Sequence, residues 1–152
     1  MKMNQVRDEI LKDPILSKLS RLAKEKEIPL FLVGGYLRDL LIGIRGKDYD
    51  FTLPKDSSPF IKAIEETLDL HFFKVGKEET NTVTYRIIRE DMSIDLTFLQ
   101  GESIETDLRR RDFTINAIAF SLQDETFHIV ERSLADIDKK VRSMDMSSRM
   151  IR

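Results

Sequence analysis

Asp48 and Asp50 are the residues of this sequence whose type and spacing most directly suggest chemistry. They begin the alternating segment Asp48–Leu53, which predicts a strand ended by Pro54. Because side chains on a strand alternate between its faces, both carboxylates point to one face and the apolar residues between them point to the core. Two carboxylates on one face repel each other unless a cation lies between them. Aspartate is a hard oxygen ligand suited to magnesium, so the pair predicts a magnesium site; the alternative is a solvated strand face.

A third carboxylate, Asp95, lies in a second alternating segment, Ser93–Phe98. Its apolar residues point one way, and Asp95 points the other way. If this strand neighbours the first, Asp95 joins the metal-binding face; otherwise it is an exposed acid on an edge strand. Two magnesium ions held about 3.5–4 Å apart by such a set can clamp the attacking and leaving oxygens of an in-line phosphoryl displacement.

Gly34 and Gly35 follow the apolar run Leu30–Val33 and precede a helical segment. Glycine lets the backbone approach a phosphate closely, and the N-terminus of the helix attracts the anion. Arg38 lies one turn into this helix and can reach the same phosphates. Asp39 beside it can orient it, or can simply cap and solubilise the helix. A Gly-Gly turn is also a common structural feature, so this prediction depends on the neighbouring motifs.

Three consecutive arginines, Arg109, Arg110 and Arg111, form a local positive site in a slightly acidic protein. Arginine matches phosphate oxygens with two parallel hydrogen bonds. Asp112 and Asn116 lie four residues apart, on one face of a helix, where they can bond a ribose hydroxyl. The alternative is a solvated basic turn with Asn116 as a satisfied polar group.

Short helices and strands must position these residues, and hydrophobic periodicity predicts where they lie. The predicted helices cover Gln5–Leu11, Pro14–Lys26, Tyr36–Ile42, Phe60–Leu68, Ile104–Arg109 and Ser133–Val141. The predicted strands cover Leu30–Val33, Asp48–Leu53, Phe72–Val75, Thr82–Arg89, Ser93–Phe98 and Phe127–Val130. The segment Phe113–Leu122 begins as a helix and ends as a strand. We therefore expect an α+β fold with a mixed, mainly antiparallel sheet flanked by helices.

The composition sets further limits. The 152 residues fit one domain, and a net charge of −2 gives no global attraction to nucleic acid. The absence of cysteine excludes disulfides and thiolate metal sites, and two histidines far apart do not suggest a zinc site. The longest apolar stretch, around Leu30–Leu37, is far shorter than the roughly 20 residues of a membrane span. We expect a cytoplasmic protein with no membrane contact.

Taken together, four segments resemble the class II tRNA nucleotidyltransferase and poly(A) polymerase family, within the DNA polymerase β superfamily. The matching segments are Leu32–Asp39, Asp48–Asp50, Ile94–Leu96 and Arg110–Ala117. Each motif is weak alone, but their order and spacing also match. The resemblance covers roughly residues 28–142 and implies a polymerase β-like nucleotidyltransferase head.

The resemblance also implies roles for the matching positions. Asp48, Asp50 and Asp95 would bind two catalytic magnesium ions, and Asp95 would help to activate the 3′-hydroxyl of the RNA primer. The residues that would hold the nucleotide are Gly34, Gly35, Arg38, Arg110, Arg111, Asp112 and Asn116. The reaction would add a nucleotide to an RNA 3′ end and release pyrophosphate.

Members of this family continue into a helical neck that reads the incoming base, and then into helical parts that hold tRNA. On this pattern, residues 1–142 form the catalytic head domain, and residues 143–152 form the start of a neck or a C-terminal tail. We expect a protein partner to supply the neck, body and tail. The connection from Phe98 to Glu105 is shorter than the mobile loop of many members that add the full CCA end. This favours a relative that adds part of that end, or a tail.

Two functions follow as hypotheses. The first is the catalytic head of a template-independent RNA nucleotidyltransferase, which adds A or C from ATP or CTP to the 3′ end of tRNA or another RNA. The alternative is a non-catalytic NTP-binding module or regulatory subunit derived from the same family. The intact carboxylate set favours the first. A relative that modifies a protein or small molecule is a third possibility, against which Arg110–Ala117 argues.

Overall fold

We examined the fold in a computed structural model, which describes residues 3–76, 83–99, 101–109 and 118–130. Several predictions from the sequence lie outside these described residues. They are the helix over Ser133–Val141, the helical beginning of Phe113–Leu122, the tail over residues 143–152, and the site residues Arg110, Arg111, Asp112 and Asn116.

Helices and strands are interspersed along the described part of the chain. The helices are α1 (Met3–Lys12), α2 (Pro14–Lys26), α3 (Gly35–Leu41), α4 (Ser58–Leu68) and α5 (Ile104–Arg109). The strands are β1 (Phe31–Val33), β2 (Asp48–Leu53), β3 (Phe73–Val75), β4 (Thr84–Arg89), β5 (Met92–Phe98), β6 (Ile118–Ser121) and β7 (Thr126–Ile129). The predicted bounds of α2, β2 and α5 are confirmed to the residue. Helix α4 begins two residues earlier than predicted, because Pro59 lies in its first turn, where a missing N–H costs nothing.

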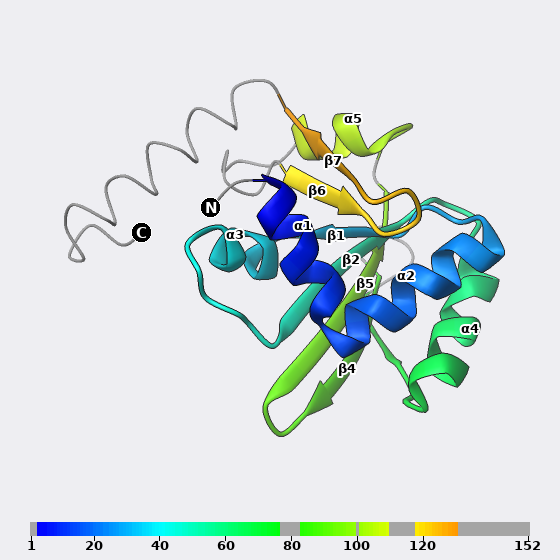
Figure 1. The fold of residues 1–152 in the computed structure, drawn as a ribbon. Helices are drawn as coiled ribbons and strands as arrows, with labels where there is room; N and C mark the ends of the chain where they lie inside the picture. Colours follow the sequence, from blue (N-terminus) through cyan, green and yellow to red (C-terminus); the bar gives the residue numbers. More distant parts are fainter. Residues whose placement is uncertain (1–2, 77–82, 100, 110–117, 131–152) are drawn as a thin grey trace.

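All seven strands form one mixed sheet in the order β3-β4-β5-β2-β1-β6-β7 (Figure 1). Every neighbouring pair is antiparallel except β2 and β5, which are parallel and lie next to each other in the middle of the sheet. The predicted α+β class with a mixed, mainly antiparallel sheet is therefore confirmed. Parallel strands need a crossover, which here runs through α4 and the β3–β4 hairpin.

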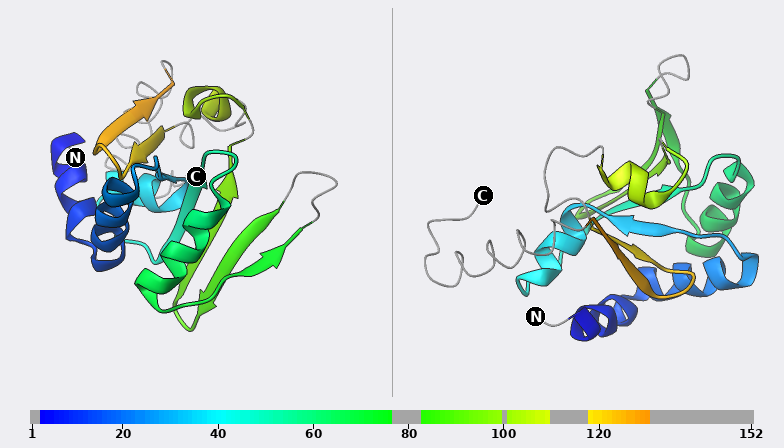
Figure 2. Two further views of the ribbon diagram at one scale, coloured as in Figure 1. Left: turned by 90° about the vertical axis from the view of Figure 1, so that its right-hand side faces the viewer. Right: turned by 90° about the horizontal axis from the view of Figure 1, so that it is seen from above.

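Two layers of apolar residues cover the two faces of the sheet unequally. The larger core lies between the sheet and helices α1, α2, α3 and α4, and it contains the inward residues Tyr49, Phe51 and Leu53 of β2. A smaller cluster on the other face joins α5 to β1 and β6 through Ile104, Leu108 and their neighbours. The view from above shows α1 and α2 on one side of the molecule and α5 on the opposite side (Figure 2). Val33, which is paired with Asp50, belongs to this smaller cluster, so the aspartates of β2 point to the same face of the sheet as α5.

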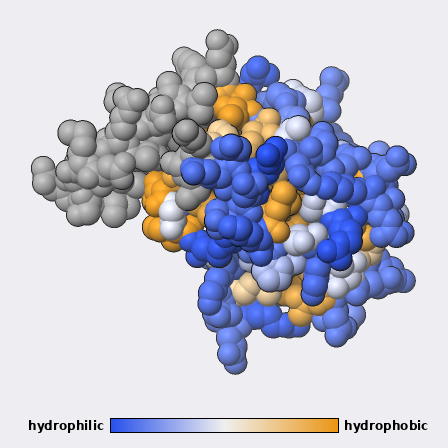
Figure 3. Space-filling view, in the orientation of Figure 1, coloured by the Kyte–Doolittle hydropathy of each residue, from blue (hydrophilic) through white to orange (hydrophobic). Residues whose placement is uncertain are grey.

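The face of the molecule drawn in Figure 3 is largely hydrophilic, with small apolar patches between charged side chains. The large hydrophobic side chains exposed among the described residues are Ile44, Phe73, Val75 and Ile88. No helix in the described ranges is both long and apolar enough to cross a membrane.

Candidate functional site

The parallel pairing of β2 with β5 brings the predicted carboxylates together. Asp50 is directly paired with Asp95, and Asp48 is directly paired with Ser93. Since paired residues on neighbouring strands point to the same face, Asp48, Asp50 and Asp95 share one side of the sheet. The condition attached to Asp95, that its strand neighbours the first, is therefore met.

The Gly-Gly turn lies directly against this face. Val33, the last residue of β1, is paired with Asp50, and Gly34 follows with a φ of +76°. A Cβ atom added to Gly34 would lie 2.8 Å from Asp50 Oδ2. Both the positive φ and this close approach require glycine here. The Gly34–Gly35 turn and the carboxylate of Asp50 therefore lie directly against each other.

Arg38 extends from α3 back over the same turn. Its Nη2 atom would lie 3.2 Å from a Cβ atom added to Gly35, so the guanidinium covers that glycine. Its Nε donates a hydrogen bond of 3.2 Å to Asp39 Oδ1. The expectation that Asp39 orients Arg38 is thus supported by the geometry. Both side chains are partly exposed, so Arg38 remains accessible to an anion.

Asp48 and Asp95 each accept a hydrogen bond from a side chain on the same face of the sheet. Ser93 Oγ donates a hydrogen bond of 2.8 Å to Asp48 Oδ1. Arg86, on β4, is paired with Asp95 and holds both of its oxygens, with Nε 2.8 Å from Oδ1 and Nη2 3.1 Å from Oδ2. Arg86 was not among the site residues predicted from the sequence. The sequence places Arg86 in a predicted strand. It does not show that β4 pairs with β5, which is what brings Arg86 beside Asp95.

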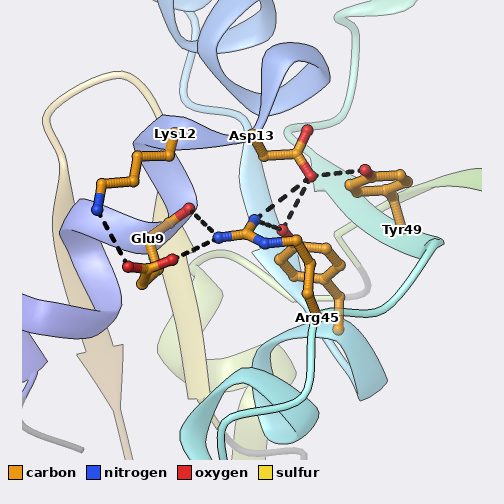
Figure 4. A network of polar contacts seen from close by, with 6 residues as sticks. Glu9, Lys12, Asp13, Arg45 and Tyr49 are labelled. Atoms are coloured by element: carbon orange, nitrogen blue, oxygen red, sulfur yellow. Dashed lines mark hydrogen bonds and ion pairs between the residues drawn. The ribbon is translucent and has the colours of Figure 1, made fainter.

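The opposite face of β2 is anchored by a buried carboxylate, Asp13, at the junction of α1 and α2 (Figure 4). Tyr49, which lies between the two aspartates of β2, donates a hydrogen bond of 2.6 Å to Asp13 Oδ2. Tyr36, in the helix that follows the Gly-Gly turn, donates another of 2.9 Å to the same oxygen. The other oxygen, Oδ1, accepts the backbone N–H groups of Ile15 and Leu16 and so caps α2. One side chain therefore connects α2, the turn helix α3 and the aspartate strand.

The environment of these two tyrosines keeps them protonated. Burial raises the pKa of Tyr36 and of Tyr49 well above the usual value, and the hydrogen bond to Asp13 raises it further. Both hydroxyls therefore remain donors at physiological pH. Arg45 completes the network: it donates to the Tyr36 hydroxyl at 2.9 Å and pairs with Glu9 at 2.7 Å.

The donor set suits a divalent metal ion in its chemistry. Three carboxylates on adjacent positions of one face offer hard oxygen ligands of the kind magnesium prefers. Their side chains do not converge on one point, however: within the described ranges, no group of three acidic, histidine or cysteine side chains is arranged to hold a metal ion. Asp95 is turned toward Arg86 and Asp48 accepts from Ser93. The chemistry of the three carboxylates therefore suits a divalent metal ion, and in this structure Arg86 occupies Asp95.

The chain is similar in sequence to several known tRNA nucleotidyltransferases. A family model described as the poly A polymerase head domain matches residues 30–142. An A-adding tRNA nucleotidyltransferase of Halalkalibacterium halodurans is 31% identical over 127 residues, which are 74% of this chain and 29% of the relative. A CCA-adding enzyme of Streptococcus pneumoniae is 31% identical over 156 residues, which are 93% of this chain and 36% of the relative. The chain therefore spans about a third of the length of these relatives.

Solved structures agree with this result. A CCA-adding enzyme in complex with ATP matches with a TM-score of 0.75 and 26% identity, over 92% of this chain and 34% of that one. A Thermotoga maritima CCA-adding enzyme in complex with tRNA matches with a TM-score of 0.69 and 26% identity, over 92% of this chain and 35% of that one. The described fold is therefore that of the head of such enzymes.

The Asp13 network leads to a prediction about stability. Asp13→Ala removes a helix cap and leaves two buried tyrosine hydroxyls without their acceptor. We expect the free energy of unfolding, measured by urea denaturation, to fall by about 2–4 kcal/mol. Asp8→Ala, an exposed aspartate in α1, serves as the control and should change it by less than about 0.5 kcal/mol. Equal losses in the two variants would show that the network does not hold the elements together.

Proposed function

Because the chain belongs to the poly(A) polymerase head-domain family, we propose that it is the catalytic head of a template-independent RNA nucleotidyltransferase. The observation that carries this proposal is the pairing of Asp50 with Asp95, beside a glycine turn that lies against Asp50. A carboxylate set next to a close backbone approach is what a site for a metal-bound triphosphate requires.

The triphosphate would lie over the Gly-Gly turn. Gly34 and Gly35 let the phosphates approach the backbone, and the guanidinium of Arg38 already lies over Gly35. From the sequence motif, Arg110 and Arg111 would add phosphate contacts, with Asp112 and Asn116 on the ribose. The nucleotides we propose are ATP and CTP, in keeping with the A-adding and CCA-adding relatives.

Asp48, Asp50 and Asp95 would hold two magnesium ions. Such ions, when bound, neutralise charge on the phosphates and lower the barrier to attack on phosphorus. Asp95 would lie next to the 3′-hydroxyl of the acceptor RNA and help to remove its proton. The 3′-oxygen would then bond to the α-phosphorus while the bond to the β-phosphate oxygen breaks and pyrophosphate leaves. The contribution of the protein would be positioning and electrostatic stabilisation.

The acceptor we propose is the 3′ end of tRNA, as in the solved complex of a similar enzyme with tRNA. The net charge of −2 gives the chain no general attraction for RNA. Base selection and most RNA contacts would therefore come from helical parts outside this head, carried by a further segment or a separate chain. A cytoplasmic location is part of the same proposal.

A second candidate is an NTP-binding module without turnover. The observation that favours it is the engagement of Asp95 by Arg86, which already bonds both oxygens of the third carboxylate. The two candidates differ in a measurable way, because the module would bind magnesium-ATP but would incorporate no labelled nucleotide into RNA.

Asp50→Asn provides the direct test of catalysis. With the helical part of an A-adding relative supplied, we expect magnesium-dependent incorporation of labelled ATP or CTP into tRNA to fall by at least about a hundredfold. Asp91→Asn, which changes an exposed aspartate paired with Lys47, is the matched control and should retain activity. Binding of magnesium-ATP without incorporation by the unmodified protein would instead support the second candidate.

Gly34→Ala tests the role of the turn, with Gly43→Ala as its control. Both glycines have a positive φ, but a Cβ atom at Gly43 would contact nothing within 4 Å, whereas at Gly34 it would strike Asp50. We expect each variant to lose about 1–3 kcal/mol of unfolding free energy from backbone strain. Only Gly34→Ala should also weaken magnesium-ATP binding, by about tenfold or more in calorimetric titration. Equal binding by both variants would contradict the proposed phosphate position.

A further inference from the structure

Arg86 and Asp95 form a two-pronged ion pair on the face of the sheet that carries the aspartates. The guanidinium uses two nitrogens, Nε and Nη2, to hold both carboxylate oxygens at 2.8 and 3.1 Å. Such two-pronged arginine–carboxylate pairs are among the stronger charge-assisted hydrogen bonds in proteins. The pair is only partly exposed, with 37% of the Arg86 side chain and 23% of the Asp95 side chain accessible to solvent.

Arg86 also acts electrostatically on the second aspartate. The pKa of the Arg86 guanidinium is raised mainly by its hydrogen bond to Asp95 and by the charge of Asp95. The charge of Asp50 raises it more weakly. Since Asp50 and Asp95 are directly paired on parallel strands, their like charges repel each other. Arg86 supplies the positive charge that offsets this repulsion from the neighbouring strand.

A divalent cation would supply the same compensation, and it would need the same carboxylate oxygens. A metal ion bound between Asp50 and Asp95 would lie close to a fixed guanidinium, and the two positive charges would repel each other. Arg86 already occupies a lone pair on each oxygen of Asp95, and its charge opposes a nearby cation, so a metal ion that binds this carboxylate competes with the pair.

We propose that Arg86 is an internal competitor of the metal ion for Asp95, so that the third carboxylate joins the metal site only as Arg86 releases it. This inference rests on the proposed function, because it requires the aspartates to bind a metal ion. Arg86 is then a positioning residue: it keeps Asp95 in place without a metal ion and raises the metal concentration needed to complete the site.

The test measures metal affinity rather than activity. Mn²⁺ replaces Mg²⁺ as an electron paramagnetic resonance probe, and its dissociation constant is determined for the full chain. In Arg86→Met, which keeps a long apolar side chain, we expect Mn²⁺ to bind about five- to tenfold more tightly, since a partly exposed pair is weaker than a buried one. Arg89→Met is the matched control: it removes the same charge from the same strand, but among the described residues Arg89 donates only to the carbonyl of Ile88. It should change the affinity less than twofold.

A double-mutant cycle separates competition from a general effect of charge. In the Asp95→Asn background, Arg86→Met should leave the Mn²⁺ affinity within about twofold, because the carboxylate for which the two cations compete is gone. Thermal unfolding of each variant confirms that the chain remains folded. Arg86→Lys, which keeps the charge but loses the two-pronged geometry, should give an intermediate affinity.

The outcomes distinguish this inference from the proposed function. If Asp50→Asn and Asp95→Asn leave Mn²⁺ binding unchanged, the aspartates are not a metal site and the proposed function fails. If these variants weaken binding but Arg86→Met does not strengthen it, the metal site stands and the competition is wrong. Weaker binding in folded Arg86→Met would also overturn the proposal, because Arg86 would then support the metal-binding arrangement.

Discussion

Asp50 and Asp95 occupy directly paired positions on parallel neighbouring strands, so two negative charges lie about one strand spacing apart. Neighbouring residues of the site compensate this repulsion, since two carboxylates on paired positions require positive charge or hydrogen-bond donors nearby. Arg86 supplies charge from β4, and Ser93 supplies a donor to Asp48. Arg38 lies over the adjacent turn with its own counter-ion, Asp39. The proposed cation and the phosphates that accompany it would bind to this face, among these charges.

The reverse side of β2 explains how such a face can be held rigid. Tyr49 separates the two aspartates in sequence and points into the core, where Asp13 accepts its hydroxyl and that of Tyr36. The carboxylate that caps α2 thus fixes both the strand that carries the aspartates and the helix that follows the glycine turn. A shift of either element would leave a buried donor or acceptor unpaired, which costs about 1–3 kcal/mol.

The sequence alone predicted the parts of this arrangement that depend on local periodicity. Alternation in Asp48–Leu53 correctly assigned the aspartates and the core residues to opposite faces, because the period of a strand is fixed by its backbone. The sequence predicted that Asp95 lies near Asp50 only on the condition that their two strands are neighbours, because strand order depends on packing over the whole chain. The partnership of Arg86 with Asp95 and the role of Asp13 were missed for the same reason. Both contacts join segments that no local pattern connects. The roles of the arginines and polar residues at positions 110–116 remain predictions.

A paramagnetic measurement would show whether a metal-bound nucleotide lies at the paired aspartates Asp50 and Asp95. With the full chain labelled with ¹⁵N, Mn²⁺ and ATP are added in small amounts and the broadening of each amide signal is recorded. We expect the amide signals of Gly34, Asp50 and Asp95 to broaden first, and that of Glu125, in the turn between β6 and β7, to broaden later. Broadening that begins at Glu125, or that affects all signals equally, would contradict this expectation.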